Sequence, residues 1–182
     1  MKKSRVFEIA YVGLKEGVHI YDYQIDQNFL VEKGYDGNDI ENLECNVRLT
    51  FDKKVNFFLL HFDIDGKAIA ACDRCGDPLE LVLWDEFKLI VKLTNDDQLT
   101  ESVEEDVVFI PFNETIIDVS EWIYEFILLT LPMQRIHGED DNGKSLCNPE
   151  MINILDEHKQ KIEEQERKNI WSGLDNLKNK QN

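Results

Sequence analysis

The chain lacks the features that would mark it as a membrane or secreted protein. No apolar run approaches the roughly eighteen residues that a membrane-spanning helix needs. The opening stretch, MKKSRVFEIAY, has no apolar segment or small-residue cleavage site behind it. The cysteines are few and unevenly spaced for the disulfide framework of a secreted module: Cys45, Cys72, Cys75 and Cys147. We therefore expect a cytoplasmic protein with reduced cysteines and no membrane contact.

Sequence motifs of the common catalytic chemistries are missing as well. There is no glycine-rich phosphate loop, no G-x-S-x-G and no H-E-x-x-H. The histidines are scattered along the chain, at His19, His61, His137 and His158. The acidic run at residues 139–141 is more typical of a solvated loop than of a pair of catalytic carboxylates. We expect that the protein is not an enzyme.

Positively charged residues are few, and they are missing altogether from one segment of the chain. The formal net charge is −17, and residues 93–134 hold ten acidic residues and no Lys, Arg or His. Residues 151–182 hold six basic and six acidic residues, so the whole excess lies in residues 1–150. Broad contact with the phosphate backbone of a nucleic acid needs clustered Lys and Arg. The scarcity of such residues therefore argues against this kind of binding. The acidic excess fits either simple solubility or attraction of a basic partner.

The hydrophobic pattern of the first half has the period of β-strands. Apolar residues alternate with polar ones over residues 43–51 and again over 58–64. Asp65-Gly66 is a tight-turn signal, so residues 68–72 are expected to form a third strand of an antiparallel meander. A long strand over residues 79–93 and a short one over 107–112 follow, separated by an exposed acidic loop over residues 94–105.

Two helices are predicted in the C-terminal half. Asp118-x-x-Glu121 resembles a capping box, and Pro132 should end that helix near Leu131. A second helix should begin with Asn148 as its cap and Pro149 in its first turn. The predicted fold is therefore α+β, with an antiparallel sheet that could be barrel-like and two helices in the C-terminal half. We expect a single domain over residues 1–165 and a polar, flexible tail over residues 166–182.

The segment Cys72-Asp73-Arg74-Cys75-Gly76 carries the strongest chemical signal in the sequence. Two thiolates three positions apart can hold one metal ion from a tight turn, and a glycine after the second permits the positive φ that such turns need. A closed zinc site requires two further ligands, for which His137 and Cys147 are the candidates and Cys45 the reserve. Zinc at these positions would have a structural role.

Two other interpretations of the cysteines stay open. The thiols could simply pack as small apolar side chains, with His137 on the surface. A thiol-redox role would require the Cys-x-x-Cys pair to begin a helix after a strand, whereas Asp77-Pro78 and a strand are expected to follow.

The order of these motifs resembles that of the YceD family. The resemblance rests on ACDRCGDPLEL and on a helix that runs into LTLPM, and it covers residues 72–147, with a looser likeness in the N-terminal strands. It implies a bacterial cytoplasmic factor needed for accumulation of large-subunit ribosomal RNA, without known catalytic chemistry.

The acidic charge of the chain suggests how such a factor could work. An acidic factor could bind a basic ribosomal protein, or dock on one in the pre-ribosomal large subunit, with its acidic face standing in for RNA. The alternative is a zinc-binding or thiol-redox protein. The sequence leaves direct RNA contact and the oligomeric state open.

Overall fold

The computed structural model describes residues 5–37, 39–95 and 106–178, with side chains as far as residue 165. The chain forms two compact units. The larger unit comprises Met1–Ala70 and Glu80–Met133, and the smaller comprises Ala71–Leu79 and Gln134–Asn182. Each unit therefore combines segments that are separated in the sequence.

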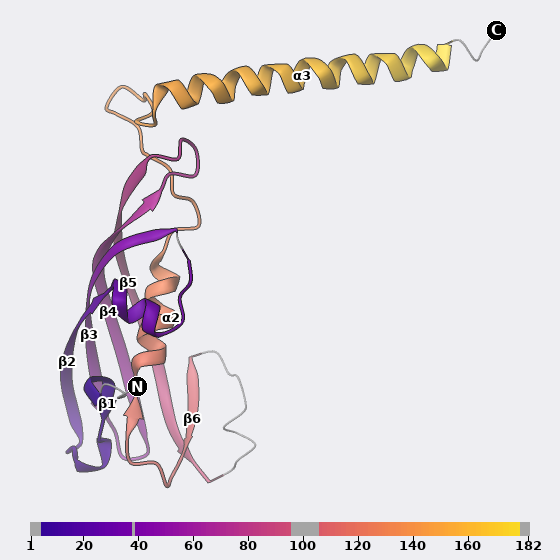
Figure 1. Cartoon of the computed structure of the whole chain (residues 1–182). Coiled ribbons are helices and arrows are strands. Elements are labelled where there is room, and N and C mark those ends of the chain that lie inside the picture. Colours follow the sequence, from indigo (N-terminus) through magenta and orange to yellow (C-terminus); the bar gives the residue numbers. More distant parts are fainter. Residues whose placement is uncertain (1–4, 38, 96–105, 179–182) are drawn as a thin grey trace. The chain divides into compact units, whose positions relative to one another are not determined.

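A five-stranded sheet is the main element of the larger unit (Figure 1). Its strands, in spatial order, are β2 (Gly17–Asp26), β3 (Ile40–Lys53), β4 (Phe57–Ala71), β5 (Pro78–Thr94) and β6 (Val107–Pro111). The pairs β2–β3 and β3–β4 are antiparallel, whereas β6 runs parallel to β5. Over the described strands the sheet is open, with β2 and β6 at its edges. The predicted α+β class is thus confirmed, and the described strands do not close into a barrel.

Alternating burial divides this sheet into an inner and an outer face. On β3 and β4 the inward side chains are those that the period-two pattern selects: Leu43, Cys45, Val47, Leu49, Phe51, Phe58, Leu60, Phe62 and Ile64. All of them are buried, and their neighbours in sequence point to the other side. The sequence pattern therefore identified both the strands and the core face correctly.

The expected turn at Asp65-Gly66 is wrong. Both residues lie inside β4, and residues 68–71 continue the same strand. Gly66 is needed there for a different reason, since it pairs with Cys45 just after a register shift in β3. A Cβ atom on Gly66 would clash with the Cys45 sulfur and would lie 2.5 Å from the carbonyl oxygen of Glu44. The glycine marks a close approach of two strands and not a reversal of the chain.

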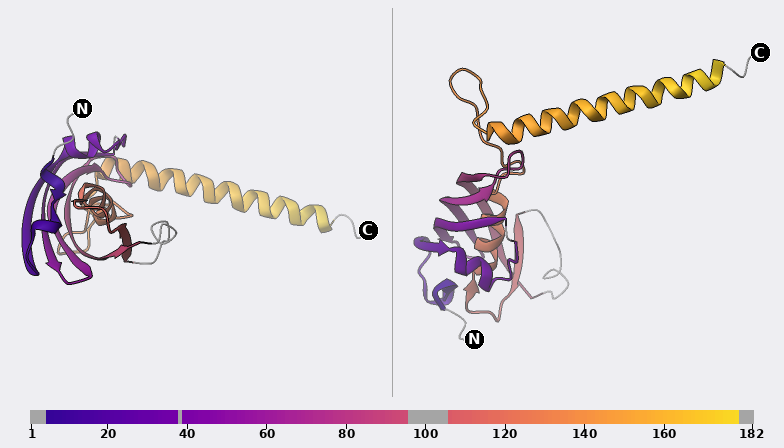
Figure 2. Two further views of the ribbon diagram at one scale, coloured as in Figure 1. Left: turned by 90° about the horizontal axis from the view of Figure 1, so that it is seen from below. Right: turned by 45° about the horizontal axis from the view of Figure 1, so that its top comes forward.

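Helix α2 (Ser120–Thr130) covers the inner face, and the strands curve around it (Figure 2, left). Ile123 and Ile127 are fully buried. The ring of Phe126 stacks on Phe87 of β5 with centroids 4.4 Å apart, and it meets Phe62 of β4 edge-on at 5.1 Å. Aromatic contacts of this kind add about 1 kcal/mol each beyond the area they bury. They fix α2 against the two central strands.

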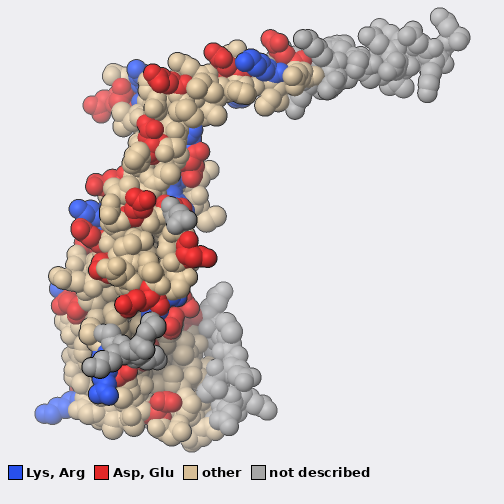
Figure 3. Space-filling model, in the orientation of Figure 1, with Lys and Arg blue, Asp and Glu red and all other residues tan. Residues whose placement is uncertain are grey.

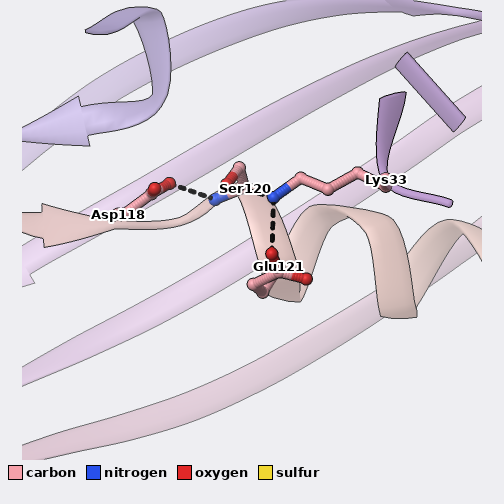
Figure 4. A network of polar contacts seen from close by, with 4 residues as sticks. All are labelled: Lys33, Asp118, Ser120 and Glu121. Atoms are coloured by element: carbon pink, nitrogen blue, oxygen red, sulfur yellow. Dashed lines mark hydrogen bonds and ion pairs between the residues drawn. The ribbon is translucent and has the colours of Figure 1, made fainter. Parts of the chain in front are cut away.

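The start of α2 is held by polar contacts that differ from the predicted capping box (Figure 4). Asp118 accepts a hydrogen bond from the backbone N–H of Ser120 at 3.0 Å. Glu121 instead accepts from the ammonium of Lys33 at 2.7 Å, and the same ammonium donates to the Ser120 hydroxyl at 2.6 Å. Because Lys33 follows helix α1 (Gln27–Glu32), this contact ties residues far apart in the sequence.

Several short elements complete the larger unit. Strand β1 (Glu8–Ile9) pairs with β7 (Ile117–Asp118), next to two short 3₁₀ helices, η1 (Arg5–Phe7) and η2 (Tyr11–Gly13). Helix α1, which sequence periodicity did not reveal, is capped by the carboxylate of Asp26. Most of the expected acidic loop, residues 96–105, lies outside the described residues.

Helix α3 (Pro149–Lys178) belongs to the smaller unit. The side-chain oxygen of Asn148 accepts from the backbone N–H of Glu150 at 3.0 Å, which confirms the predicted cap. Among the described residues, none of the helices combines the length and apolar character that a membrane span requires. The division into a domain over residues 1–165 and a flexible tail over 166–182 stays a prediction, since α3 continues through that boundary.

Substitution of Gly66 by alanine tests the close approach of β3 and β4. The added methyl group would meet backbone atoms that cannot rotate away, so we expect the free energy of unfolding to fall by about 2–3 kcal/mol. Denaturant unfolding followed by circular dichroism measures it. Gly13→Ala is the matched control, because nothing lies within 4 Å of its Cβ position. Equal unfolding midpoints for the two variants would contradict the proposed crowding.

Candidate metal centre

The Cys-x-x-Cys segment forms a tight turn between β4 and β5. The backbone N–H of Gly76 donates to the carbonyl of Cys72 at 2.8 Å, and the N–H of Cys72 donates to the carbonyl of Asp77 at 2.9 Å. Gly76 has a φ of +78°, as the sequence predicts. Both thiols are buried. The turn therefore presents two sulfur atoms on one side of a short, closed loop.

A second loop brings His137 and Cys147 together, although nine residues separate them. The N–H of Leu146 donates to the carbonyl of Gly138 at 2.9 Å, so the chain doubles back over residues 138–146. The carboxylate of Asp140 accepts from the N–H of Asn142 and of Lys144 and so stabilises the tip. This fold-back explains why the spacing of His137 and Cys147 gave no clear signal in the sequence.

Hydrogen bonds join the two loops to each other. Asp73 and Arg135 exchange two of them: the Asp73 N–H donates to the Arg135 carbonyl, and the Asp73 carboxylate accepts from the Arg135 N–H, both at 2.7 Å. The side-chain amide of Asn148 donates to the carboxylate of Asp77 at 3.1 Å. These contacts place His137 and Cys147 opposite the cysteine turn.

The distances among the four side chains suit one tetrahedral zinc ion. The sulfurs of Cys72 and Cys147 are 3.8 Å apart, and the sulfur of Cys75 is 3.5 Å from Nδ1 of His137. Ordinary zinc bond lengths in a tetrahedron give edges of about 3.8 Å between two sulfurs and about 3.5 Å between sulfur and nitrogen. All four ligand atoms lie within 4.8 Å of one another. The predicted set of ligands is thus assembled in one place.

The imidazole of His137 is oriented for this role. Its Nε2 lies 3.2 Å from the carbonyl oxygen of Pro78. A proton on Nε2 satisfies that carbonyl and leaves the lone pair of Nδ1 directed at the sulfurs. A histidine that binds a metal commonly donates its second N–H to a backbone carbonyl in this way.

The backbone around Cys72 favours the thiolate, which is the form that binds metal. Burial raises the pKa of Cys72, but hydrogen bonds from the backbone N–H groups of Cys75, His137 and Arg74 outweigh it and lower the pKa to about 6. The pKa of His137 is raised, chiefly by its hydrogen bond with Cys72. A negative charge is therefore stabilised where a zinc ligand would need it, and the residues fit the metal.

The surroundings of the four side chains indicate a structural site. Leu79, Ile136 and Ile152 pack against the three cysteines and close them off from water. Catalytic zinc sites keep one position open for water or substrate, whereas four protein ligands leave none. The cysteine turn also leads into β5 and not into a helix, so it lacks the strand-to-helix setting that is typical of redox Cys-x-x-Cys pairs.

Cys45, the reserve ligand of the sequence prediction, is not part of this cluster. It lies on the inner face of β3 in the larger unit, opposite Gly66. Burial, with a smaller contribution from Asp65, raises the pKa of its thiol to about 11. Cys45 is therefore a packing residue.

A second group of possible ligands lies on the outer face of the sheet, where sequence reasoning had not looked. Nε2 of His61 is 2.9 Å from Asp63 and 3.6 Å from Glu86 of β5. The two-residue spacing of His61 and Asp63 on β4 was visible in the sequence, but the partner from β5, Glu86, was not. The group is open to solvent, in contrast to the buried cysteine cluster.

Fold and site together define a two-unit α+β protein with a centre of three buried cysteines and one partly exposed histidine. Comparison with known families finds a match over residues 60–178 to the family described as "Large ribosomal RNA subunit accumulation protein YceD". The chain belongs to this family, as its motifs suggested, and the family name implies a role in large-subunit ribosomal RNA accumulation. No curated protein and no solved structure matches the chain significantly.

Elemental mass spectrometry of the untagged protein tests the metal centre. We expect one zinc ion per chain in the wild type and its loss in Cys75→Ser, because a serine hydroxyl is a poor replacement for a thiolate ligand. Cys45→Ala is the control and should keep its zinc. A wild-type protein without metal, purified reduced and free of chelator, would show that the cysteines only pack.

Removal of the histidine ligand should weaken zinc binding without abolishing it. In His137→Ala three thiolates remain, and we expect the zinc affinity to fall by about tenfold or more. Competition with a chromophoric chelator measures the change. His158→Ala, an exposed histidine of the same unit, is the matched control. Equal affinities in both variants would remove His137 from the ligand set.

Proposed function

We propose that the protein is a non-enzymatic, cytoplasmic ribosome-biogenesis factor that supports accumulation of large-subunit ribosomal RNA. It does so by binding a basic ribosomal protein, alone or on the pre-ribosomal large subunit. Family membership supports the process, and the distribution of charge supports the mode of binding.

The observation that carries this proposal is the acidic excess of residues 1–150. They account for the whole net charge of −17. On the face seen in Figure 3, carboxylate side chains are spread over the described surface and basic ones are few. Such a field attracts cationic proteins and repels nucleic acid.

Direct binding of RNA finds less support in the described residues. The basic side chains described on α3, Lys159 and Lys161, lie between two acidic pairs, at residues 156–157 and 163–164, and Lys161 is paired with Glu157 at 3.9 Å. Basic residues diluted in this way release few counterions from a phosphate backbone.

In this proposal zinc has an architectural part. Bound to Cys72, Cys75, His137 and Cys147, the ion would cross-link the cysteine turn to the loop before α3. The ligands come from segments about 60 residues apart, and closing such a loop costs chain entropy that metal binding offsets. The function therefore rests on binding surfaces, with the metal holding the smaller unit in shape.

Dependence on salt tests the proposed partner. We expect the protein to bind purified basic large-subunit ribosomal proteins, and the affinity to fall at least about tenfold as salt rises from 0.1 to 1 M, because the Debye length shrinks from about 10 Å to about 3 Å. Calorimetry or fluorescence anisotropy measures the binding. An acidic ribosomal protein is the control. Salt-insensitive binding, or tighter binding to naked ribosomal RNA, would contradict the proposal.

A further inference from the structure

The outer face of the sheet exposes two large apolar side chains on β5. Val82 and Trp84 are 80% and 70% exposed, whereas Leu81 and Leu83, which point inward, are 6% and 1% exposed. Outward positions on a solvated antiparallel sheet are ordinarily polar. A tryptophan held there by a rigid strand offers an amphipathic ring to a partner.

These two side chains line neighbouring hollows in the same face. Val82 borders a hollow of about 750 Å³ and Trp84 one of about 480 Å³. The hollows share Gln24, Asn46 and Asp65 as lining residues, so they form one continuous depression across β2, β3, β4 and β5. We name this depression the outer groove.

Strand register sets the charges of the outer groove. One row across β2, β3 and β4 consists of Asp22, Arg48 and Asp63. The lining residues include six acidic ones, Asp22, Asp26, Glu44, Asp63, Asp65 and Glu80, against two basic ones, Arg48 and Lys67.

Both basic side chains already have acidic partners in the groove. Arg48 binds Asp22 at 2.8 Å, and Lys67 lies 3.5 Å from Glu44. The groove therefore has a negative excess beside its apolar side chains.

We propose that the outer groove binds an extended lysine- and arginine-rich segment of a partner protein, an inference that rests on the proposed binding of a basic protein and locates it. Lysine and arginine combine an aliphatic stem with a cationic head. The stems would lie on Val82 and Trp84, and one head could stack on the Trp84 ring. The remaining heads would bind carboxylates such as Asp63 and Asp65.

A synthetic peptide of alternating lysine and alanine, with a glutamate–alanine peptide as negative control, tests the outer groove directly. We expect Trp84→Ala to weaken binding of the lysine peptide about tenfold or more, as loss of a central tryptophan commonly does. Trp84→Phe keeps an aromatic face and should stay within about threefold of the wild type. Isothermal titration calorimetry measures the affinities, and circular dichroism shows that each variant is folded.

Matched control variants show whether a loss of binding comes from the groove residues themselves or from the net charge and exposed apolar surface of the protein. Asp63→Asn with Asp65→Asn should weaken binding more than Asp141→Asn with Glu150→Gln, which removes the same charge elsewhere. Leu129→Ala removes an apolar side chain that is 65% exposed on α2 and should leave binding unchanged. Equal losses in the test and control variants, or no loss in either, would overturn the proposal.

Two further outcomes separate this inference from the proposed function. If ribosomal proteins bind the Trp84→Ala variant and the wild type equally, the outer groove is wrong and the proposed function stands. If the peptide requires Trp84 but no ribosomal protein binds, the groove stands and the proposed partner is wrong. A single-stranded RNA oligonucleotide that binds more tightly than the peptide, and also requires Trp84, would overturn the assignment of a protein ligand.

Discussion

Burial of helix α2 against one face of the sheet is the constraint on which the larger unit depends. The ring of Phe126 between Phe62 and Phe87, with Ile123 and Ile127 fully buried, determines which side chains of the central strands point inward. Because side chains of a strand alternate, the same contacts turn Val82 and Trp84 to solvent. Core and outer groove are thus two results of one register, and a slip of one residue would exchange them.

The smaller unit has a different source of order. Its apolar residues are few, and three of them, Leu79, Ile136 and Ile152, cover the cysteine cluster. A unit of this size gains little from hydrophobic burial alone, so a metal cross-link between its loops would have a large effect on its stability. Hydrogen bonds between Asp73 and Arg135 already bring the loops together, which lowers the entropy that a metal ion must offset. The distances among the four side chains and the lowered pKa of Cys72 also suit a metal ion at this cluster.

Acidic charge bears on the proposed binding in two ways, through the whole chain and through the outer groove. The acidic excess is a property of the whole chain, but affinity for a cationic segment requires carboxylates placed beside apolar surface at a fixed spacing. Rows of residues across β2, β3 and β4 provide that spacing, since neighbouring strands lie about 4.8 Å apart. In the proposed binding mode, the outer groove would give the diffuse attraction between the acidic chain and a basic partner one defined surface.

The sequence by itself determined the α+β class, the inward residues of β3 and β4, helix α2 and the cap of α3. It also named four candidates for the cysteine–histidine cluster, with Cys45 in reserve, but only the tertiary structure showed that the four lie together. These predictions follow from local periodicity, from caps and from residue chemistry. Only the tertiary structure decided that Asp65-Gly66 lies within a strand, that Glu121 binds Lys33, and that Trp84 borders a groove. Each of these features depends on which distant segment packs against the residue concerned. Gly66 is an example: a glycine suits a turn and a close approach of two strands equally well, so local sequence cannot distinguish the two.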